Sequence, residues 1–156
     1  MKKYLTIIIA IVAAFAITGC GNKTSKEVIK HCKLTTNNTE EKYNLDVEYV
    51  LYGNGDYAKK LEIIETVTSS DDSVIEYFDE YLKDTYNKYN ELYGSFTNKI
   101  NKENGKLISN TIMEYDKMDL KKYAEDNSII KDYVKNDKIM FKGLVELYET
   151  LGAVCE

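Results

Sequence analysis

Two segments of the chain alternate between apolar and polar residues, which is the pattern of a strand with one buried face. Between positions 43 and 51 the odd-numbered residues are apolar or aromatic, and positions 44, 46 and 48 are polar. A second such segment covers residues 57–68, and the intervening Gly53-Asn54-Gly55-Asp56 suits a tight turn. We therefore predict an antiparallel hairpin, preceded by a short first strand at residues 32–36 and a turn at residues 37–40.

The period changes after residue 68, where residues 69–73 (SSDDS) offer capping hydroxyls and acidic groups that favour a helix start. Apolar residues then recur within an arc of about 120° up to residue 93, which predicts a helix of about 20 residues ended by Gly94. Tyr81 falls inside this arc, whereas Tyr77 and Tyr86 fall at its edges, where a phenol can bury its ring and keep its hydroxyl in water. We favour a core stripe over a platform for a carbohydrate or aromatic ligand.

The second half of the chain begins with another hairpin, at residues 96–101 and 106–115, whose turn contains the favourable pair Asn104-Gly105. A short helix capped by Asp119 follows, then a helical turn through residues 129–134 with Asn127 or Ser128 as its cap, and a closing helix at residues 141–151. Residues 153–155 return extended. The predicted fold is α+β, with an antiparallel sheet of about five strands packed against one long helix and with short C-terminal helices.

The first twenty residues have the three parts of an export signal, namely Lys2 and Lys3, an apolar run at residues 5–17, and small residues before a cysteine. A helix of thirteen residues would span roughly 20 Å, which is too short for the roughly 30 Å of a bilayer core. The sequence Ile17-Thr18-Gly19-Cys20 resembles the lipobox of bacterial lipoproteins, in which Cys20 would receive a diacylglyceryl group and become the first residue. We expect residues 1–19 to be the signal peptide, 20–30 a flexible tether, and 31–156 a single domain.

Charge limits the partners of this domain. Loss of Lys2 and Lys3 with the leader would change the formal charge from −5 to −7. Such an acidic body should be repelled by nucleic acid and by anionic headgroups, so we expect no nucleic-acid partner and membrane attachment through the acyl chains on Cys20. All basic residues are lysine, which removes the guanidinium group that usually grips phosphate or carboxylate with two bonds.

Two further cysteines, Cys32 and Cys155, lie near the two ends of the expected domain. Export would place them where disulfides persist, so we expect them to form a bridge that ties the chain ends together. The alternative is a pair of reactive thiols or metal ligands with His31 as a helper. One histidine and two distant cysteines make a poor metal site, so we predict no metal.

Three stretches carry a resemblance to a known family. Residues 45–56 (LDVEYVLYGNGD), 111–123 (TIMEYDKMDLKKY) and 147–152 (LYETLG), together with the lipobox, look like the YehR-like bacterial lipoproteins. The resemblance covers most of the expected domain, but it consists of scaffold residues. It implies a small α+β lipoprotein domain of unknown function, and it transfers no functional residue.

The sequence lacks the common catalytic motifs, including the nucleophile elbow, the phosphate-binding glycine loop, the dinucleotide fingerprint and the zinc-protease helix. The acidic pairs Glu40-Glu41 and Asp71-Asp72 are interpreted as turn and cap residues, and His31 is the single side chain that titrates near neutral pH when unperturbed. We expect no enzyme and no cofactor. The favoured hypothesis is a lipid-anchored, extracytoplasmic module on the cell membrane that binds an unknown small ligand or envelope protein. A structural role in envelope assembly is the alternative, and hydrolase activity is less favoured.

Overall fold

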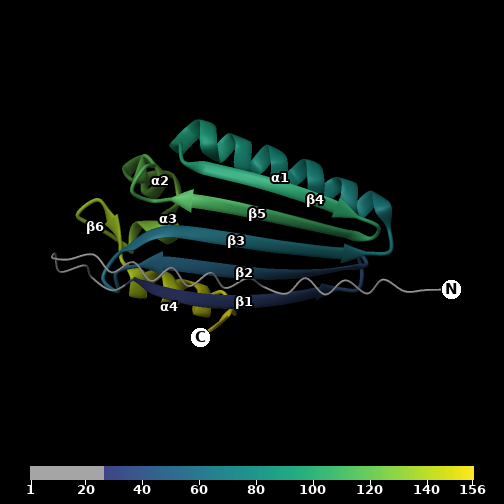
Figure 1. The fold of residues 1–156 in the computed structure, drawn as a ribbon, viewed down its shortest axis with the longest axis horizontal. Coiled ribbons are helices and arrows are strands. Elements are labelled where there is room, and N and C mark those ends of the chain that lie inside the picture. Colours follow the sequence, from purple (N-terminus) through teal and green to yellow (C-terminus); the bar gives the residue numbers. More distant parts are fainter. Residues whose placement is uncertain (1–26) are drawn as a thin grey trace, which may run out of the picture.

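The computed structural model describes residues 27–156. The expected signal peptide, the lipobox residues Ile17, Thr18, Gly19 and Cys20, and most of the expected tether lie outside the described residues. The described chain forms a six-stranded antiparallel sheet with the strand order β4-β5-β3-β2-β1-β8 (Figure 1). These strands are β1 (Val28–Asn38), β2 (Tyr43–Gly53), β3 (Ala58–Ser69), β4 (Phe96–Glu103), β5 (Lys106–Glu114) and β8 (Val154–Cys155). The prediction of an α+β fold with an antiparallel sheet is confirmed.

The first strand is longer than residues 32–36, the segment expected from the sequence. β1 pairs with β2 along its whole length, from Val28 opposite Gly53 to Asn38 opposite Tyr43. The ordered sheet therefore begins three residues before the boundary expected between tether and domain. The short prediction has a physical reason, since β1 carries lysines and a histidine and shows little apolar alternation at its start.

One face of the sheet is covered by helices and holds the core. The side chains of Leu51, Leu61, Val67 and Leu107, at most 1% exposed, point from β2, β3 and β5 to this inner face. Helix α1 (Asp72–Tyr93) packs mainly against β4, with further contacts to β3 and β5. The predicted helix and its ends are confirmed, and Gly94 follows it with φ of 71°. Its cap is the Asp71 carboxylate, which accepts a hydrogen bond from the Ser73 backbone amide, where the sequence had suggested a serine hydroxyl.

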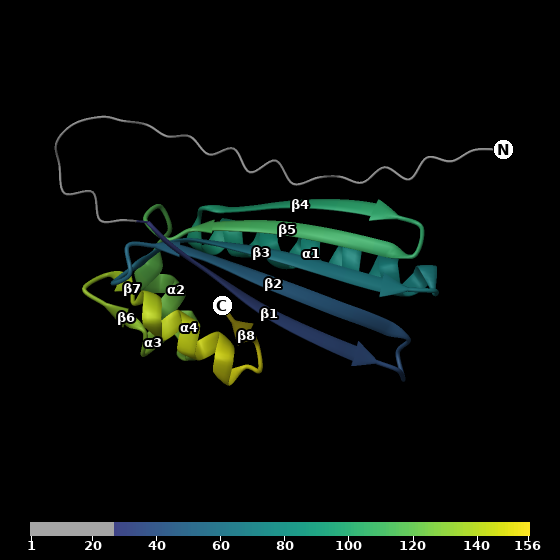
Figure 2. The same cartoon turned by 60° about the horizontal axis from the view of Figure 1, so that its bottom comes forward.

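The C-terminal elements gather at one end of the sheet, the end where β1 begins (Figures 1 and 2). They are α2 (Leu120–Asp126), α3 (Ser128–Lys131), β6 (Val134–Lys135), β7 (Lys138–Ile139) and α4 (Phe141–Thr150). Asp119 caps α2, as predicted, by accepting a hydrogen bond from the Lys122 amide. The helical turn expected up to residue 134 is wrong at its end, because Asn136 and Asp137 adopt positive φ and turn the chain into the β6–β7 hairpin.

Helix α4 packs on the inner face of β1 and β2. A Cβ atom on Gly53 would overlap the backbone oxygen of Tyr57 and the ring of Phe141, so glycine permits the close approach of α4 to the end of β2. Further along the same strand, the rings of Tyr49 and Tyr148 stack with centroids 4.1 Å apart. These contacts place α4 over the half of β2 that lies nearest to Gly53.

The first and last strands of the described chain meet at the edge of the sheet. A disulfide joins Cys32 in β1 to Cys155 in β8, which is the pairing expected from the sequence. The backbone amides of His31 and Glu156 each donate a hydrogen bond to the other residue's carbonyl oxygen, at 3.1 and 2.9 Å. The last residues are therefore held against β1, and β8 supplies the sixth strand of the sheet.

Candidate functional site

An open groove lies at the end of the molecule opposite the C-terminal elements. We call it the aromatic groove; it has a volume of about 700 Å³ and lies between the β1–β2 turn and the first turns of α1. Its lining residues are Glu40, Glu41, Lys42, Tyr43, Asp71, Ser73, Val74, Tyr77, Phe78 and Tyr81. This volume is within the range of about 300–1,000 Å³ that is usual for ligand sites.

Four aromatic rings form the apolar part of the aromatic groove. Tyr43 points from the inner face of β2 and meets the Phe78 ring edge to face at a centroid distance of 5.0 Å. Phe78 also contacts Tyr77 at 5.5 Å, and Tyr77 lies nearly parallel to Tyr81 at 5.9 Å. Residues 77 and 81 are one helical turn apart, so their side chains are neighbours on the helix surface. Both are largely exposed, at 60% and 52% of their surface.

The exposure of Tyr81 differs from the sequence prediction, which placed it in the buried arc of the helix. The edge position predicted for Tyr77 agrees with its exposure, but that predicted for Tyr86 does not, because Tyr86 is buried. The inner stripe of α1 thus runs through Ile75, Leu82 and Tyr86, and the flank that carries Tyr77 and Tyr81 faces solvent. The sequence did contain a signal for this exposed pair, namely two tyrosines spaced i, i+4. The position of these residues around the helix could not by itself distinguish an exposed pair from a pair in the core.

Polar residues join the two sides of the aromatic groove. The buried Ser69 hydroxyl donates a hydrogen bond of 2.8 Å to the backbone oxygen of Lys42 and accepts one of 3.0 Å from the Asp71 amide. The end of the β1–β2 turn and the start of α1 are thereby fixed to the same side chain. Hydrogen bonds from the Ser73 hydroxyl and then from its amide lower the pKa of Asp71, so this carboxylate stays ionised further into acid than an ordinary aspartate.

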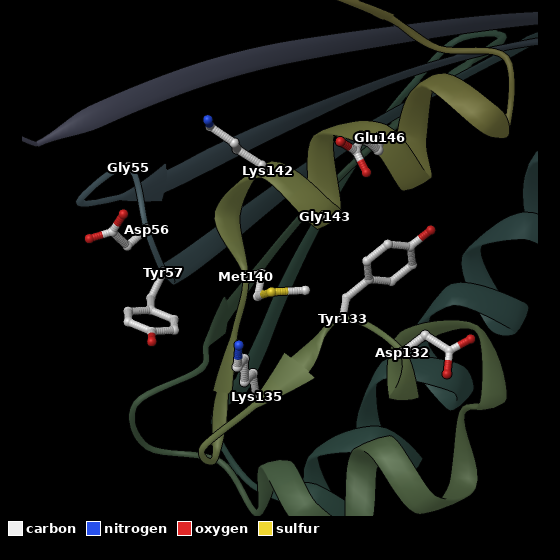
Figure 3. Close-up of a pocket in the computed structure, with 10 residues that line it drawn as sticks. All are labelled: Gly55, Asp56, Tyr57, Asp132, Tyr133, Lys135, Met140, Lys142, Gly143 and Glu146. Atoms are coloured by element: carbon white, nitrogen blue, oxygen red, sulfur yellow. The ribbon is translucent and has the colours of Figure 1, made fainter.

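A second pocket of about 450 Å³ lies at the other end of the sheet, between residues 55–57, the β6–β7 hairpin and α4 (Figure 3). Three of its five charged groups point apart, since Figure 3 shows Asp56 and Asp132 pointing to opposite sides and Lys142 pointing outward. The other two, Lys135 and Glu146, come from separate elements, β6 and α4. Tyr133 lies so close to Gly143 that a Cβ atom there would overlap its ring. We interpret this pocket as the packing seam of the C-terminal elements.

A partly buried polar cluster lies beneath α1 and lines neither of these two pockets. The Glu65 carboxylate accepts hydrogen bonds from the Tyr86 hydroxyl at 3.0 Å and the Ser109 hydroxyl at 3.1 Å. The Asn98 amide donates to Ser109 and Thr111, each at 2.8 Å. Burial raises the pKa of Glu65, and the hydrogen bonds from the Tyr86 and Ser109 hydroxyls partly oppose that shift. A single carboxylate surrounded by groups that donate hydrogen bonds to it or to one another is typical of a structural network. The cluster also lacks the second acid or base that hydrolysis would use.

The described residues show no metal site around His31 or elsewhere, and the one side chain among them that hydrogen-bonds His31 is Glu48. Within residues 27–156, no group of three histidine, cysteine, aspartate or glutamate side chains is arranged to hold a metal ion. His31 lies on the outer face of the sheet, where its Nδ1 is 2.9 Å from the Glu48 carboxylate. None of the helices in this described part of the chain has the length and apolar character needed to span a bilayer.

The sheet order, the single long helix and the cluster of short C-terminal elements define a small α+β domain with a YehR-like fold. The structure is similar to the solution structure of the YehR protein from Escherichia coli, with a TM-score of 0.51 and 15% identity over 80% of this chain and 88% of that one. It is also similar to the solution structure of a protein from Streptococcus pneumoniae TIGR4, with a TM-score of 0.53 and 13% identity over 99% of both chains. No protein-family model matches the chain, and no curated protein sequence matches it. At these identities the likeness establishes the fold alone.

Proposed function

We propose that this protein is a lipid-anchored extracytoplasmic lipoprotein whose domain binds a ligand or an envelope partner in the aromatic groove and performs no catalysis. The observation that carries the binding role is the groove itself, where Tyr77 and Tyr81 expose more than half of their surface. Large exposed aromatic side chains grouped at a hollow are typical of recognition surfaces.

The anchoring role rests on the lipobox that ends at Cys20, with the polar segment that follows it acting as a tether. The described chain enters the sheet at Val28, and the aromatic groove lies at the opposite end of β1. A strand of 11 residues is about 36 Å long at roughly 3.3 Å per residue. An anchor at Cys20 would therefore leave the groove at the end of the domain that lies away from the attachment point.

The proposal of a non-catalytic domain rests on the chemistry of the two pockets. The aromatic groove carries carboxylates on exposed turn and cap positions, and the smaller pocket carries charges that diverge. In the aromatic groove the Ser73 hydroxyl donates a hydrogen bond to Asp71, but this carboxylate also accepts the Ser73 amide as the cap of α1. These bonds lower the pKa of Asp71, which makes it a weak base for activating a nucleophile. Binding is the function that exposed rings and an open shape support.

The anchor is tested by expressing the full-length protein and its Cys20→Ala variant in a bacterial host that processes lipoproteins. The mature wild-type protein should fractionate with membranes, and its intact mass should correspond to a chain that starts at Cys20 with added fatty acyl groups. The variant should lose this mass increment. Recovery of unacylated wild-type protein in the soluble fraction would contradict the anchor.

The binding role is tested by native mass spectrometry of the protein gently extracted from its own membrane. A non-covalent adduct should be present on the wild-type protein and should be lost from the Tyr77→Ala/Tyr81→Ala double variant. Ile129→Ala is the matched control, because Ile129 is an equally exposed apolar side chain, at 59%, in α3 at the other end of the sheet. An adduct that is still present on the double variant would show that the ligand does not bind in the aromatic groove.

A further inference from the structure

The rim of the aromatic groove carries an excess of negative charge. Glu40, Glu41 and Asp71 contribute three carboxylates, and Lys42 is the one cation among the lining residues. None of the ion pairs found within residues 27–156 includes any of these four side chains. The rim carboxylates are therefore available to a positively charged partner.

Local hydrogen bonds hold two of these carboxylates in place. The Glu41 carboxylate accepts a hydrogen bond of 2.9 Å from the Asn38 side-chain amide, whose oxygen in turn accepts one of 3.0 Å from the Glu41 backbone amide. Asp71 is fixed by its bonds from the amide and hydroxyl of Ser73, at 3.0 and 2.6 Å. The negative charges are thus positioned beside the rings before any partner arrives, which lowers the cost of ordering them on binding.

The aromatic rings and the carboxylates favour the same kind of group. The face of a tyrosine ring attracts a cation, and each exposed contact of this kind strengthens binding about threefold. The nearly parallel rings of Tyr77 and Tyr81, at an interplanar angle of 13°, form a surface that suits an alkyl stem. A lysine or arginine side chain offers both parts, since its stem packs on apolar surface and its charged head remains in a polar rim.

The shape and position of the groove favour a segment of protein as its occupant. The groove is open, because two of its rings expose more than half of their surface, so it suits an extended segment better than an enclosed small molecule. It also lies at the far end of β1 from Val28, about 36 Å from where the chain enters the sheet. The net negative rim also disfavours the anionic lipid headgroups of the anchoring membrane.

We infer that the aromatic groove binds a lysine- or arginine-bearing, partly apolar segment of another envelope protein. This inference rests on the proposed binding function of the groove, and it adds the chemical class of the partner. The apolar side chains of such a segment would pack on Tyr43 and Phe78, and its cationic groups would lie between the exposed tyrosine rings and the rim carboxylates.

The test measures fluorescence anisotropy of labelled synthetic peptides with the full-length protein in neutral detergent. The probe is a short peptide of alternating lysine and leucine, and its partners have glutamine or glutamate in place of every lysine. The lysine peptide should bind most tightly and should weaken as salt is added. The Tyr77→Ala/Tyr81→Ala variant should lose about tenfold in affinity, which is the sum of two exposed cation–aromatic contacts.

Charge variants separate the inference from the proposed function. Glu40→Gln/Glu41→Gln should reduce the preference for the lysine peptide over the glutamine peptide, while Ile129→Ala should change neither affinity. If glutamine and lysine peptides bind equally and the tyrosine variant weakens both, the groove binds but its partner is not cationic, and the inference is overturned. If the lysine peptide binds and the tyrosine variant has no effect, the binding reflects the acidic body in general, which also overturns it. Circular dichroism spectra and thermal midpoints of all variants verify that they are folded.

Discussion

Opening the disulfide between Cys32 and Cys155 should remove a large part of the stability of the domain. The two cysteines are separated by 123 positions, so the bridge closes nearly the whole described chain into one loop. In the chain-entropy model, a loop of this length destabilises the unfolded state by about 5 kcal/mol at 25 °C. The total free energy of unfolding of a domain is usually about 5–15 kcal/mol, so the expected loss is a large fraction of it.

The folded state should change little when the bridge opens. The loss of stability therefore comes from the unfolded chain, which gains conformational entropy once the loop is open. Cys32 is fully buried in the core, and the paired backbone bonds between His31 and Glu156 can hold β8 against β1 without the sulfur bond. Cys155 is half-buried, so Cys155→Ser removes little packing. We expect this variant to lose about 4 kcal/mol, slightly less than the model value, because the reduced unfolded chain retains some compactness.

The assay is urea unfolding followed by circular dichroism, with and without dithiothreitol. The oxidised wild-type protein should be the most stable form, and the reduced wild type and Cys155→Ser should agree with each other. The dependence of the free energy on urea should be steeper for the reduced forms, because their unfolded chains expose more surface. A loss below about 1 kcal/mol with an unchanged urea dependence would refute the loop-entropy reasoning.

Three further predictions concern the contact of α4 at Gly53, the Glu65 carboxylate and the groove wall at Ser69. Gly53→Ala should destabilise the domain by about 1–3 kcal/mol in urea unfolding, because its Cβ would meet the backbone of Tyr57 and the ring of Phe141; an unchanged midpoint would show that α4 can shift freely. Glu65→Gln should raise the thermal midpoint at neutral pH and have less effect in acid. The raised pKa of Glu65 means that the folded state binds this proton more tightly than the unfolded chain does. The wild type therefore loses stability as the pH rises from the pKa of Glu65 in the unfolded chain to its higher pKa in the folded protein. Glu62→Gln, on the outer face of the same strand, is the control for charge loss, and an equal response of both variants would contradict the burial argument. Ser69→Ala should weaken any groove ligand and lower stability by about 1–2 kcal/mol, because it leaves the Lys42 oxygen and the Asp71 amide without their shared partner; ligand binding that is unaffected would show that the groove walls are held independently.

Most of the fold follows from local patterns in the sequence. The alternation at residues 43–51 and 57–68 and the change to a helical period near Asp71 correspond to β2, β3 and α1. Asn104-Gly105 marks the β4–β5 turn, where Gly105 has a φ of 69°. These features depend on neighbours along the chain, so a single sequence can reveal them.

The β6–β7 hairpin shows where the local argument failed. The apolar spacing of residues 129–134 suits a helix, yet α3 ends at Lys131. The pair Asn136-Asp137, in which both residues adopt positive φ, turns the chain sharply, and Tyr57 bridges to Met140 just after β7. A turn-forming pair between two short apolar segments was a signal for a hairpin, and it competed with the helical period.

The polar residues of α1 show a second limit, because their burial depends on distant strands. By the helical period Asp79 lies opposite the apolar arc of α1, but it is buried, with its oxygens 2.7 Å from the ammonium groups of Lys83 and Lys102. Hydrogen bonds from Lys102 and then Lys83 hold its pKa below the usual value. Lys102 comes from β4, on the inner face of the sheet edge, so helical periodicity alone could not place this pair.

The aromatic groove results from the difference in length between β2 and α4. The 11 residues of β2 extend for about 36 Å, whereas the 10 residues of α4 extend for about 15 Å. Because Phe141 packs at Gly53 and Tyr148 at Tyr49, α4 covers the half of β2 near Gly53 and ends before Tyr43. α1 has 22 residues and is long enough to follow the sheet, but it packs mainly on β4, so only the Phe78 flank of α1 reaches the uncovered end of β2. Tyr77 and Tyr81 are therefore exposed because no element of the described chain covers the sheet beside them: α4 ends before Tyr43, and α1 packs mainly on β4. This depends on distant parts of the chain, so the helical pattern of α1 could not predict it.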